Sequence, residues 1–269
     1  MKAIDKNNKI FESAEFKKDK YKFNIIFKNL DSETLELYSD EEEYMICRGK
    51  MDKPAWIWTK DNFDKTKIEE IETLIKRYIL DTDKTKFTCK KELYDLLVER
   101  KFAELNNDDY FEMGFLICKE AKQPNDCDLI KELSDEKDKE VLTKYWFDDC
   151  NEMNGVEGIS MEQAEKDVDE YIATKKFYVL KNKEGKIVCM AGYKLLDEQA
   201  RIGHVYTPKE ERRKGYAANL IYQITKELLE RGYVPLLYTD YNYIPSNRAY
   251  INAGYEDTGI LINFSCTKK

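Results

Sequence analysis

The most regular hydrophobic pattern of the chain lies in its last third. An apolar run over residues 200–206 predicts a short strand that stops at Thr207 and Pro208. A charged turn follows. Beyond Gly215, apolar side chains recur at the spacing of one helix face, at Ala217, Leu220, Ile221, Ile224 and Leu228. Gly232 stands where that helix is expected to end. The pattern therefore predicts a strand, a tight turn and an amphipathic helix in direct succession.

The rest of the C-terminal half alternates between strand and helix patterns. We expect strands at residues 115–120, 177–180, 186–193, 236–240 and 261–266. We expect helices at residues 126–153, after a capping box that begins at Ser160, and between residues 246 and 254. This order predicts an α/β (α+β layered) fold, in which a mixed sheet is flanked by helices.

Composition narrows the class of protein without identifying it. The chain has 269 residues, enough for one large or two modest domains. Charged residues are abundant, and no apolar run approaches the length of a membrane span. The first twenty residues are mostly charged, so no signal peptide is predicted. The net charge of -8 disfavours a general nucleic-acid binder. We expect neither nucleic acid nor a membrane as a partner.

Cysteine and histidine usage excludes several kinds of site. The seven cysteines are scattered and show no C-x-x-C spacing, which indicates free thiols in a reducing cytoplasm. His204 is the single histidine, so a multi-histidine metal site is excluded and no metal is expected. His204 lies in the strand that leads to Thr207, which makes it a candidate general base; a packed or solvated strand histidine is the alternative.

The turn before the amphipathic helix carries candidate binding chemistry. The first amide groups of a helix lack intrahelical partners, and with the helix dipole they form a site for phosphate oxygens. Gly215 lets the backbone approach a ligand closely, and Arg212, Arg213 and Lys214 add positive charge. The sequence therefore predicts a diphosphate cradle. Neither G-x-G-x-x-G after this strand nor G-x-x-x-x-G-K-[ST] occurs, so the common nucleotide loops are not present.

Two motifs in this region resemble those of the GNAT superfamily of N-acetyltransferases. The run Arg212-Arg213-Lys214-Gly215-Tyr216-Ala217 fits R-x-x-G-x-A, which is similar to the acetyl-CoA pyrophosphate loop of that family. About thirty residues on, a short apolar strand is followed by Ser246-Asn247-Arg248-Ala249-Tyr250 and then by Gly254-Tyr255. This is similar to the S-N-x-x-Y-x-x-x-G-Y/F pattern near the end of many GNAT enzymes. The resemblance covers roughly residues 113–266.

The resemblance implies roles for individual residues. Backbone groups of Val205, Tyr206 and Thr207 would hold the pantetheine arm of acetyl-CoA, and the Val205 amide would polarise the thioester oxygen. The diphosphate would lie on the turn and first helical residues, namely Arg212, Arg213, Lys214, Gly215, Tyr216, Ala217 and Ala218. Asn247 would contact CoA. Tyr250 lies three residues on, on the same helix face, and would protonate the leaving thiolate.

The N-terminal half has a weaker pattern of the same kind. We expect strands at residues 23–27, 34–37, 44–47, 55–59 and 86–88, and helices at residues 68–79 and 91–100. This is loosely the order of the C-terminal half, but it lacks both motifs. A degenerate GNAT-like copy and a plain α+β accessory domain both fit. The polar, turn-prone residues 106–109 predict the junction, which divides the chain into a smaller N-terminal domain (1–108) and an acetyltransferase domain (109–269).

Two classes of function follow. The first is an acetyl-CoA-dependent N-acetyltransferase, with acetyl-CoA as co-substrate and a primary amine of a small molecule or peptide as acceptor. The second is a non-catalytic acyl-CoA-binding sensor or regulatory module, which would keep the cradle without turnover. The presence of Asn247 and Tyr250 favours the enzyme.

Overall fold

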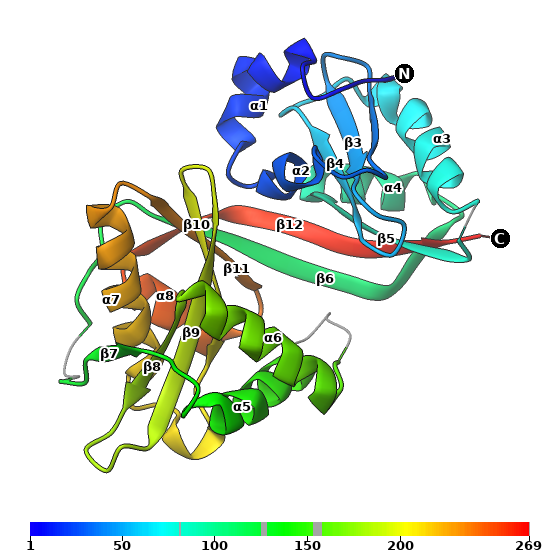
Figure 1. The fold of residues 1–269 in the computed structure, drawn as a ribbon. Coiled ribbons are helices and arrows are strands. Elements are labelled where there is room, and N and C mark those ends of the chain that lie inside the picture. The colour runs from blue at the N-terminus through cyan, green and yellow to red at the C-terminus, as the bar shows by residue number, and fades with distance from the viewer. Residues whose placement is uncertain (81, 125–127, 153–157, 269) are drawn as a thin grey trace. The chain divides into compact units, whose positions relative to one another are not determined.

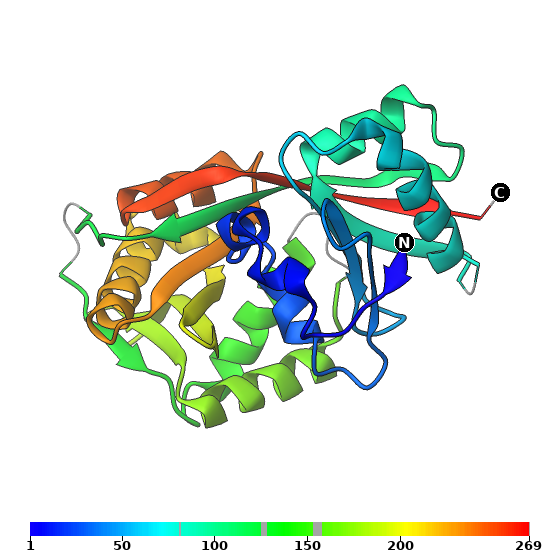
Figure 2. The ribbon, with the colours of Figure 1, turned by 90° about the horizontal axis from the view of Figure 1, so that it is seen from above.

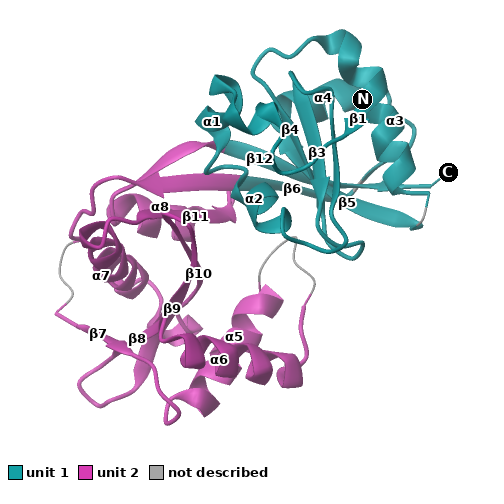
Figure 3. Cartoon of the chain, turned by 45° about the horizontal axis from the view of Figure 1, so that its top comes forward, with its two compact units in different colours: residues 1–113, 260–269 teal, residues 114–259 magenta. Residues whose placement is uncertain are grey.

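The computed structural model describes residues 1–268, apart from residues 81, 125–127 and 153–157. The chain divides into two compact units (Figure 3). Unit 1 comprises Met1–Met113 and Ile260–Lys269, and unit 2 comprises Gly114–Gly259. Two long strands, β6 (Leu105–Cys118) and β12 (Tyr255–Thr267), each contribute one segment to either unit. No helix among the described residues is both long enough and apolar enough to cross a membrane.

Unit 1 contains a mixed sheet covered by helices. Its strands lie in the order β1-β2-β3-β4-β5-β12-β6, and β4 and β5 are parallel. The elements are β1 (Lys2–Ala3), η1 (Lys9–Glu12), α1 (Ala14–Asp19), α2 (Asn24–Asn29), β2 (Glu36–Ser39), β3 (Tyr44–Arg48), β4 (Ala55–Thr59), η2 (Lys65–Lys67), α3 (Ile68–Tyr78), β5 (Lys84–Lys90) and α4 (Lys91–Glu99).

The alternation of side chains along β4 builds a core on each face of this sheet. Ala55 and Ile57 pack in the cluster that includes α3, α4 and the end of β12. Trp56 and Trp58 alternate with these two residues and point to the opposite face of the sheet. Trp58 is fully buried there and meets the ring of Phe16 edge-on at 5.2 Å. Period-two alternation therefore places every residue of β4 in packing contact.

Unit 2 repeats the same architecture. Its strands lie in the order β12-β6-β11-β10-β9-β8-β7, and β10 and β11 are parallel. The elements are β7 (Lys131–Leu133), α5 (Lys139–Glu152), α6 (Met161–Thr174), β8 (Phe177–Lys181), β9 (Ile187–Leu196), β10 (Gln199–Tyr206), η3 (Lys209–Glu211), α7 (Tyr216–Glu230), β11 (Val234–Asp240) and α8 (Ile244–Asn252).

Helices cover both faces of the unit 2 sheet (Figure 1). The cluster that includes the apolar residues of α7 takes Ala191 of β9 and Ala200 and Ile202 of β10. The opposite cluster joins α5 and α6 to Met190 of β9 and to Tyr206 of β10. The sheet therefore separates α7 from α5 and α6, and the loop after β10 leads directly into α7.

The two units have the same element order: a short strand, helical segments, three antiparallel strands, a helix, a parallel strand, a helix and a long strand. In each unit the end of the sheet is completed by β6 lying beside β12 (Figure 1 and Figure 2). In unit 1 the β12 segment comes from the far end of the sequence. The N-terminal half is thus a second copy of the fold, not a plain accessory domain.

Several expected elements differ in the structure. Residues 23–27 were expected to form a strand, but this is wrong: α2 occupies this region, with Phe23 and Ile26 three residues apart and both fully buried. The expected helix at residues 126–153 begins only at Lys139, because β7 pairs with β8 at Lys131 and Leu180. Part of that expected helix lies outside the described residues. The five-residue pattern at residues 23–27 did not distinguish a strand from a helix, and β7 depends on pairing with a distant strand.

The division of the chain also differs from the expected boundary after residue 108. Residues 106–109 continue β6 and form no turn, and the units divide between Met113 and Gly114. Residues 260–269 return to unit 1, where Leu261 to Thr267 pair with β5. Residues 106–109 are polar and therefore resemble a turn in the sequence. They form a strand because they pair with segments that are distant in the sequence.

Candidate active site

The centre of the candidate site is a β-bulge in β10. Gly203 pairs with Gly192 of β9, but the next register pair joins Tyr206 to Met190, so β10 has one residue more than β9 over this stretch. His204 lies within the bulge in a left-handed backbone conformation, with φ of 52°. Bulges reorient side chains locally. Accordingly Tyr206 packs on the α5 and α6 face, although Ile202 packs against α7.

The edge of β10 that faces β11 is only partly paired. The parallel register joins residues 199–201 to residues 234–236 and does not extend further along either strand. The last five residues of β10 therefore lack a β11 partner. An unpaired strand edge can accept an extended ligand as an additional strand. This edge contains Val205 and Tyr206 and leads to Thr207, the residues expected to hold a pantetheine arm.

The turn into α7 presents free amide groups. Gly215 is the N-cap with φ of 79°, no side chain caps the helix, and Arg213 is also left-handed with φ of 66°. The first hydrogen bond into the helix runs from the Asn219 amide to the Gly215 carbonyl at 3.1 Å. Within the described part of the chain, the amides of residues 213–218 donate to no acceptor. Such a nest of N–H groups at a helix N-terminus fits a diphosphate.

The space around the turn agrees with that fit. A Cβ atom on Gly215 would meet no atom within 4 Å, so the approach to the amides is open. The first turn of α7 carries no acidic residue. Tyr216 and Ala217 are half-buried and Ala218 is buried, which holds these three residues in place while their amides remain available.

The three basic side chains of the turn are not equivalent. Arg212 donates from Nε to the Thr207 carbonyl at 2.9 Å and pairs with Glu152 of α5 at 2.6 Å. Lys214 pairs with Glu211 at 2.7 Å. Arg213 is exposed and has no ion-pair partner among the residues that the structure describes. Arg212 thus fastens the turn to the strand end, and Arg213 is the side chain most available to a phosphate.

Carboxylates shape the electrostatics of this turn. Burial acts to raise the pKa of Glu152, but hydrogen bonds and ion pairs from Arg212 and Lys209 outweigh it and the pKa is lowered. The pKa of Glu211 is lowered by its hydrogen bonds to Lys214 and Lys186. Both side chains are therefore ionised at neutral pH and neutralise part of the positive charge of the turn.

Asn247 organises the loop between β11 and α8. Its amide nitrogen donates to the carbonyls of Asp240 at 3.1 Å and Tyr241 at 2.8 Å, and its oxygen accepts from Thr239 at 3.0 Å. Both N–H donors are therefore used inside the chain. α8 begins at Ile244, two residues before the expected start, with Tyr243 as its N-cap. A CoA contact by Asn247, which the family motif implies, would use the remaining lone pair of the amide oxygen.

Tyr250 lies in the core beneath this loop. Its ring is 8% exposed, and its hydroxyl forms no hydrogen bond within the described residues. Burial, followed by the charge of Asp149 and the neighbouring Cys189, raises the pKa of the phenol well above its usual value. Cys189 in turn accepts a hydrogen bond from Thr207 at 3.4 Å. Tyr250 is thus a protonated phenol that shares neighbours with the end of β10.

His204 is held by aromatic rings and one carboxylate. Its ring stacks on Trp146 with centroids 3.7 Å apart, and Tyr171 meets it edge-on at 5.6 Å. Its Nδ1 lies 3.3 Å from Oδ2 of Asp149, a buried residue of α5. The alternative to a general base, a histidine packed beside the sheet, accounts for the contacts on the ring faces. The carboxylate contact and the partial exposure also fit a general base.

Asp149 and His204 also lie close to the thiol of Cys150, a grouping within reach of one metal ion. Burial raises the pKa of the Cys150 thiol to about 12, so this sulfur is protonated at neutral pH. Metal ligation needs the thiolate. The Nδ1 atom of His204, which faces this cluster, already contacts Asp149. The cluster therefore fits a carboxylate–imidazole pair better than a set of metal ligands.

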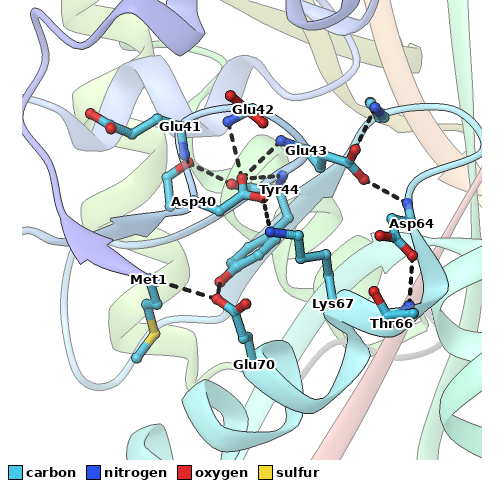
Figure 4. A network of polar contacts seen from close by, with 12 residues as sticks. Met1, Asp40, Glu41, Glu42, Glu43, Tyr44, Asp64, Thr66, Lys67 and Glu70 are labelled. Carbon is cyan, nitrogen blue, oxygen red and sulfur yellow. Dashed lines mark hydrogen bonds and ion pairs between the residues drawn. The ribbon is translucent and has the colours of Figure 1, made fainter.

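The equivalent turn of unit 1 lies between β4 and α3 and is built differently (Figure 4). The Asp64 amide donates to the Glu43 side chain at 2.6 Å, and the Thr66 amide donates to the Asp64 side chain at 2.9 Å. The first turn of α3 carries Glu69 and Glu70. The chain's own carboxylates therefore take donors that a phosphate would use, and the helix N-terminus repels an anion.

The structure brings most of the predicted site residues together in unit 2. The end of β10, which carries His204, and the turn into α7 are continuous, and Tyr250 lies near Cys189, whose sulfur accepts from Thr207 after the strand end. Sequence reasoning missed Asp149, the buried partner of His204. No signal marked it, because Asp148 and Asp149 are adjacent acids on an amphipathic helix and only the fold distinguishes them.

Comparisons with known proteins agree with this geometry. Residues 139–255 match the model of the family described as Acetyltransferase (GNAT) family. No curated protein matches the chain in sequence. Among solved structures, a GNAT-family acetyltransferase from Colwellia psychrerythraea matches with a TM-score of 0.61 and 13% identity, covering 99% of either chain.

Two further solved structures show the same fold. A GCN5-related N-acetyltransferase from Kribbella flavida matches with a TM-score of 0.63 and 13% identity, covering 96% of this chain and 97% of that one. Another from Sphaerobacter thermophilus has a TM-score of 0.58 and 10% identity, with 83% and 80% covered. At these identities the likeness concerns the fold, and it extends over both units.

The fold, the amide cradle and the family match together define an acyltransferase of the GNAT type. Residues 139–255 match this family, and the N-terminal half is a second, GNAT-like copy of the fold. The expectations of the family and of a mixed sheet flanked by helices are confirmed.

Proposed function

We propose that the chain is an acetyl-CoA-dependent N-acetyltransferase that acts on a primary amine of a small molecule or peptide. The observation that carries the proposal is the set of unpaired amides at residues 213–218, which an anionic diphosphate would satisfy. The family supplies the reaction type, acyl transfer from acyl-CoA. The acetyl donor and the amine acceptor are part of this proposal.

In this proposal the cradle and the strand edge position the thioester. Residues 213–218 would hold the diphosphate, and the backbone of Val205, Tyr206 and Thr207 would pair with the pantetheine arm. The Val205 amide lies in the bulge and would donate to the thioester oxygen as negative charge develops there. Positioning both substrates in one complex lowers the entropic barrier to direct attack.

The proton transfers would use two side chains. As the amine nitrogen bonds to the acyl carbon and the C–S bond breaks, His204 would accept a proton from the amine and Tyr250 would give one to the thiolate. The raised pKa keeps the phenol of Tyr250 protonated at neutral pH, so its proton is available to the departing sulfur. Solvent would then restore both groups.

The location and partners also remain proposals. The six cysteines that the structure describes are free thiols, which supports the proposed cytoplasmic location. The proposed partners are acetyl-CoA and the amine. A depression of about 150 Å³ between α5 and the turn after β10 has both acidic and basic side chains along its wall, including Asp148 and Lys209.

A screen of amines and peptides with acetyl-CoA tests the proposal, with release of free thiol as the readout. We expect at least one primary amine to give turnover that the Gly215→Glu variant lacks. Acetyl-CoA binding without turnover over a broad amine panel would contradict the enzyme and leave the sensor. Turnover that persists in the folded Gly215→Glu variant would contradict the cradle.

A further inference from the structure

A buried carboxylate faces the single histidine of the chain. Asp149 lies in the last turns of α5, is 8% exposed, and places Oδ2 3.3 Å from Nδ1 of His204. No described residue forms a hydrogen bond to Nε2 of His204. The two ring nitrogens therefore have different surroundings: one contacts a carboxylate, and the other is left for a ligand.

The imidazole plane is also fixed. Trp146 stacks on one face of the ring at an interplanar angle of 21°, and Tyr171 approaches edge-on at 75°. The backbone of His204 is held in the bulge with φ of 52°. A strained backbone conformation that packing enforces is often associated with function. With its plane and one nitrogen fixed, the ring has a single orientation to present to a substrate.

We propose that Asp149 is the positioning residue that keeps the proton of the neutral imidazole on Nδ1, so that Nε2 offers its lone pair to the attacking amine. This inference rests on the proposed function. In the acyl-transfer step, the amine nitrogen bonds to the acyl carbon while its proton moves to Nε2. Nδ1–H stays hydrogen-bonded to Asp149, whose charge stabilises the imidazolium. Tyr250 protonates the sulfur as the C–S bond breaks.

Two other acidic residues lie near Asp149, but neither has its contact with the imidazole of His204. Asp167 of α6 accepts from Nε1 of Trp146 at 3.3 Å and does not contact the imidazole. Asp148 precedes Asp149 on α5 but lines the surface depression described above. Among the residues that the structure describes, Asp149 alone can select the tautomer by direct contact. A neutral asparagine there could instead donate to Nδ1, which would move the ring proton to Nε2 and remove the lone pair that the reaction needs.

Because the chain has one histidine, nitrogen NMR of ¹⁵N-histidine-labelled protein reports this ring alone. At a pH where the ring is neutral, we expect the wild type to carry its proton on Nδ1. Asp149→Asn should shift the population toward the Nε2–H form, and the matched control Asp148→Asn should keep the wild-type spectrum. A wild-type proton on Nε2, or a tautomer unchanged in Asp149→Asn, overturns the inference.

Kinetics provide the second readout. Asp149→Asn should lower kcat by about 10²–10⁴-fold, the range of general acid–base groups, while the KM for acetyl-CoA stays within about twofold. In a His204→Gln background the same substitution should have little further effect, because the two residues act as a unit. A kcat equal to that of the wild type would overturn the role, whereas a purely structural loss would also weaken acetyl-CoA binding.

The NMR and kinetic experiments can fail independently, so they test the role of Asp149 separately from the proposed function. The spectrum needs no turnover, so a proton on Nε2 refutes the role of Asp149 even in an active enzyme. Conversely, an Nδ1–H tautomer that depends on Asp149 supports the positioning even if the amine screen fails, in which case the proposed function is at fault.

Discussion

The two units of this protein share one architecture and differ at one turn, the connection from the third antiparallel strand to the helix that follows it. In unit 2 this turn has Gly215 at the helix N-terminus and amides without acceptors among the described residues. In unit 1 the equivalent turn has no glycine, and Glu43 and Asp64 accept hydrogen bonds from its amides.

This difference shows that the fold does not by itself create a phosphate site. Both helices have a positive N-terminal dipole, but α3 neutralises it with acidic residues in its first turn and α7 does not. The run of acids at residues 40–43 is part of this internal network, since Asp40 accepts from three amides and pairs with Lys67. On a common scaffold, local side chains therefore determine whether the helix N-terminus is open to an anion.

The largest effect is expected at the cradle. We expect acetyl-CoA to raise the thermal stability of the wild type, and Gly215→Glu should abolish that rise, because a carboxylate would occupy the proposed diphosphate site and the backbone there is left-handed. Thermal unfolding with and without acetyl-CoA measures this. Thr66→Glu, an exposed position in the unit 1 turn, is the matched control and should keep the full shift. An undiminished shift in folded Gly215→Glu would break the comparison.

A large effect on stability is expected where the chain returns to unit 1. Phe264 of β12 is fully buried, and its ring stacks on Phe87 of β5 at 5.5 Å. Phe264→Ala should lower the free energy of unfolding by about 3–5 kcal/mol, because it leaves a cavity in the unit 1 core. Denaturant unfolding tests this, with exposed Glu256→Ala on the same strand as control. A loss below about 1 kcal/mol would show that unit 1 does not depend on this segment.

The chemical step should respond to Tyr250. Tyr250→Phe keeps the ring packing, so affinity for acetyl-CoA should stay nearly unchanged, whereas kcat should fall by about 10–1000-fold. The loss should shrink with a thioester whose leaving thiol is more acidic, since that thiolate needs less help to depart. Steady-state kinetics on any active amine provide the measurement. Equal turnover in the variant and the wild type would remove Tyr250 from the acid role.

The smallest effect is expected in the unit 1 turn. Glu43→Gln should weaken the hydrogen bonds to the Asp64 amide and to Lys60 and destabilise the protein by about 1 kcal/mol. It should not create a second acyl-CoA site, because Glu69 and Glu70 remain at the start of α3. Exposed Glu42→Gln is the control and should leave stability unchanged. Acetyl-CoA binding to unit 1 of the Glu43→Gln variant would show that this carboxylate alone blocks the site.

Local patterns predicted the parts of the fold that are locally encoded. The helix at Tyr216–Glu230 and the capping box, in which Ser160 accepts from the Gln163 amide, are as expected, because their signals lie within one turn. The strand β7 and the return of β12 to unit 1 depend on pairing with distant segments, so no local pattern encodes them.

The residues of the candidate site also fall into a group that local sequence predicts and a group that only the fold brings together. The cradle follows from a strand, a glycine and a helix in sequence, and these are local. The contact between Asp149 and His204 joins residues that are 55 positions apart, and the bulge that turns His204 toward α5 is a property of the paired sheet. The local signal therefore predicted where a diphosphate would bind, whereas the groups proposed to move protons needed the fold.

The central claim is that one of two equivalent turns binds acyl-CoA. Isothermal titration of the full chain with acetyl-CoA tests it most directly, because stoichiometry counts sites without requiring an acceptor. We predict one acetyl-CoA per polypeptide, and none for the Gly215→Glu variant. Two sites per chain, or one site that survives in folded Gly215→Glu, would contradict the account.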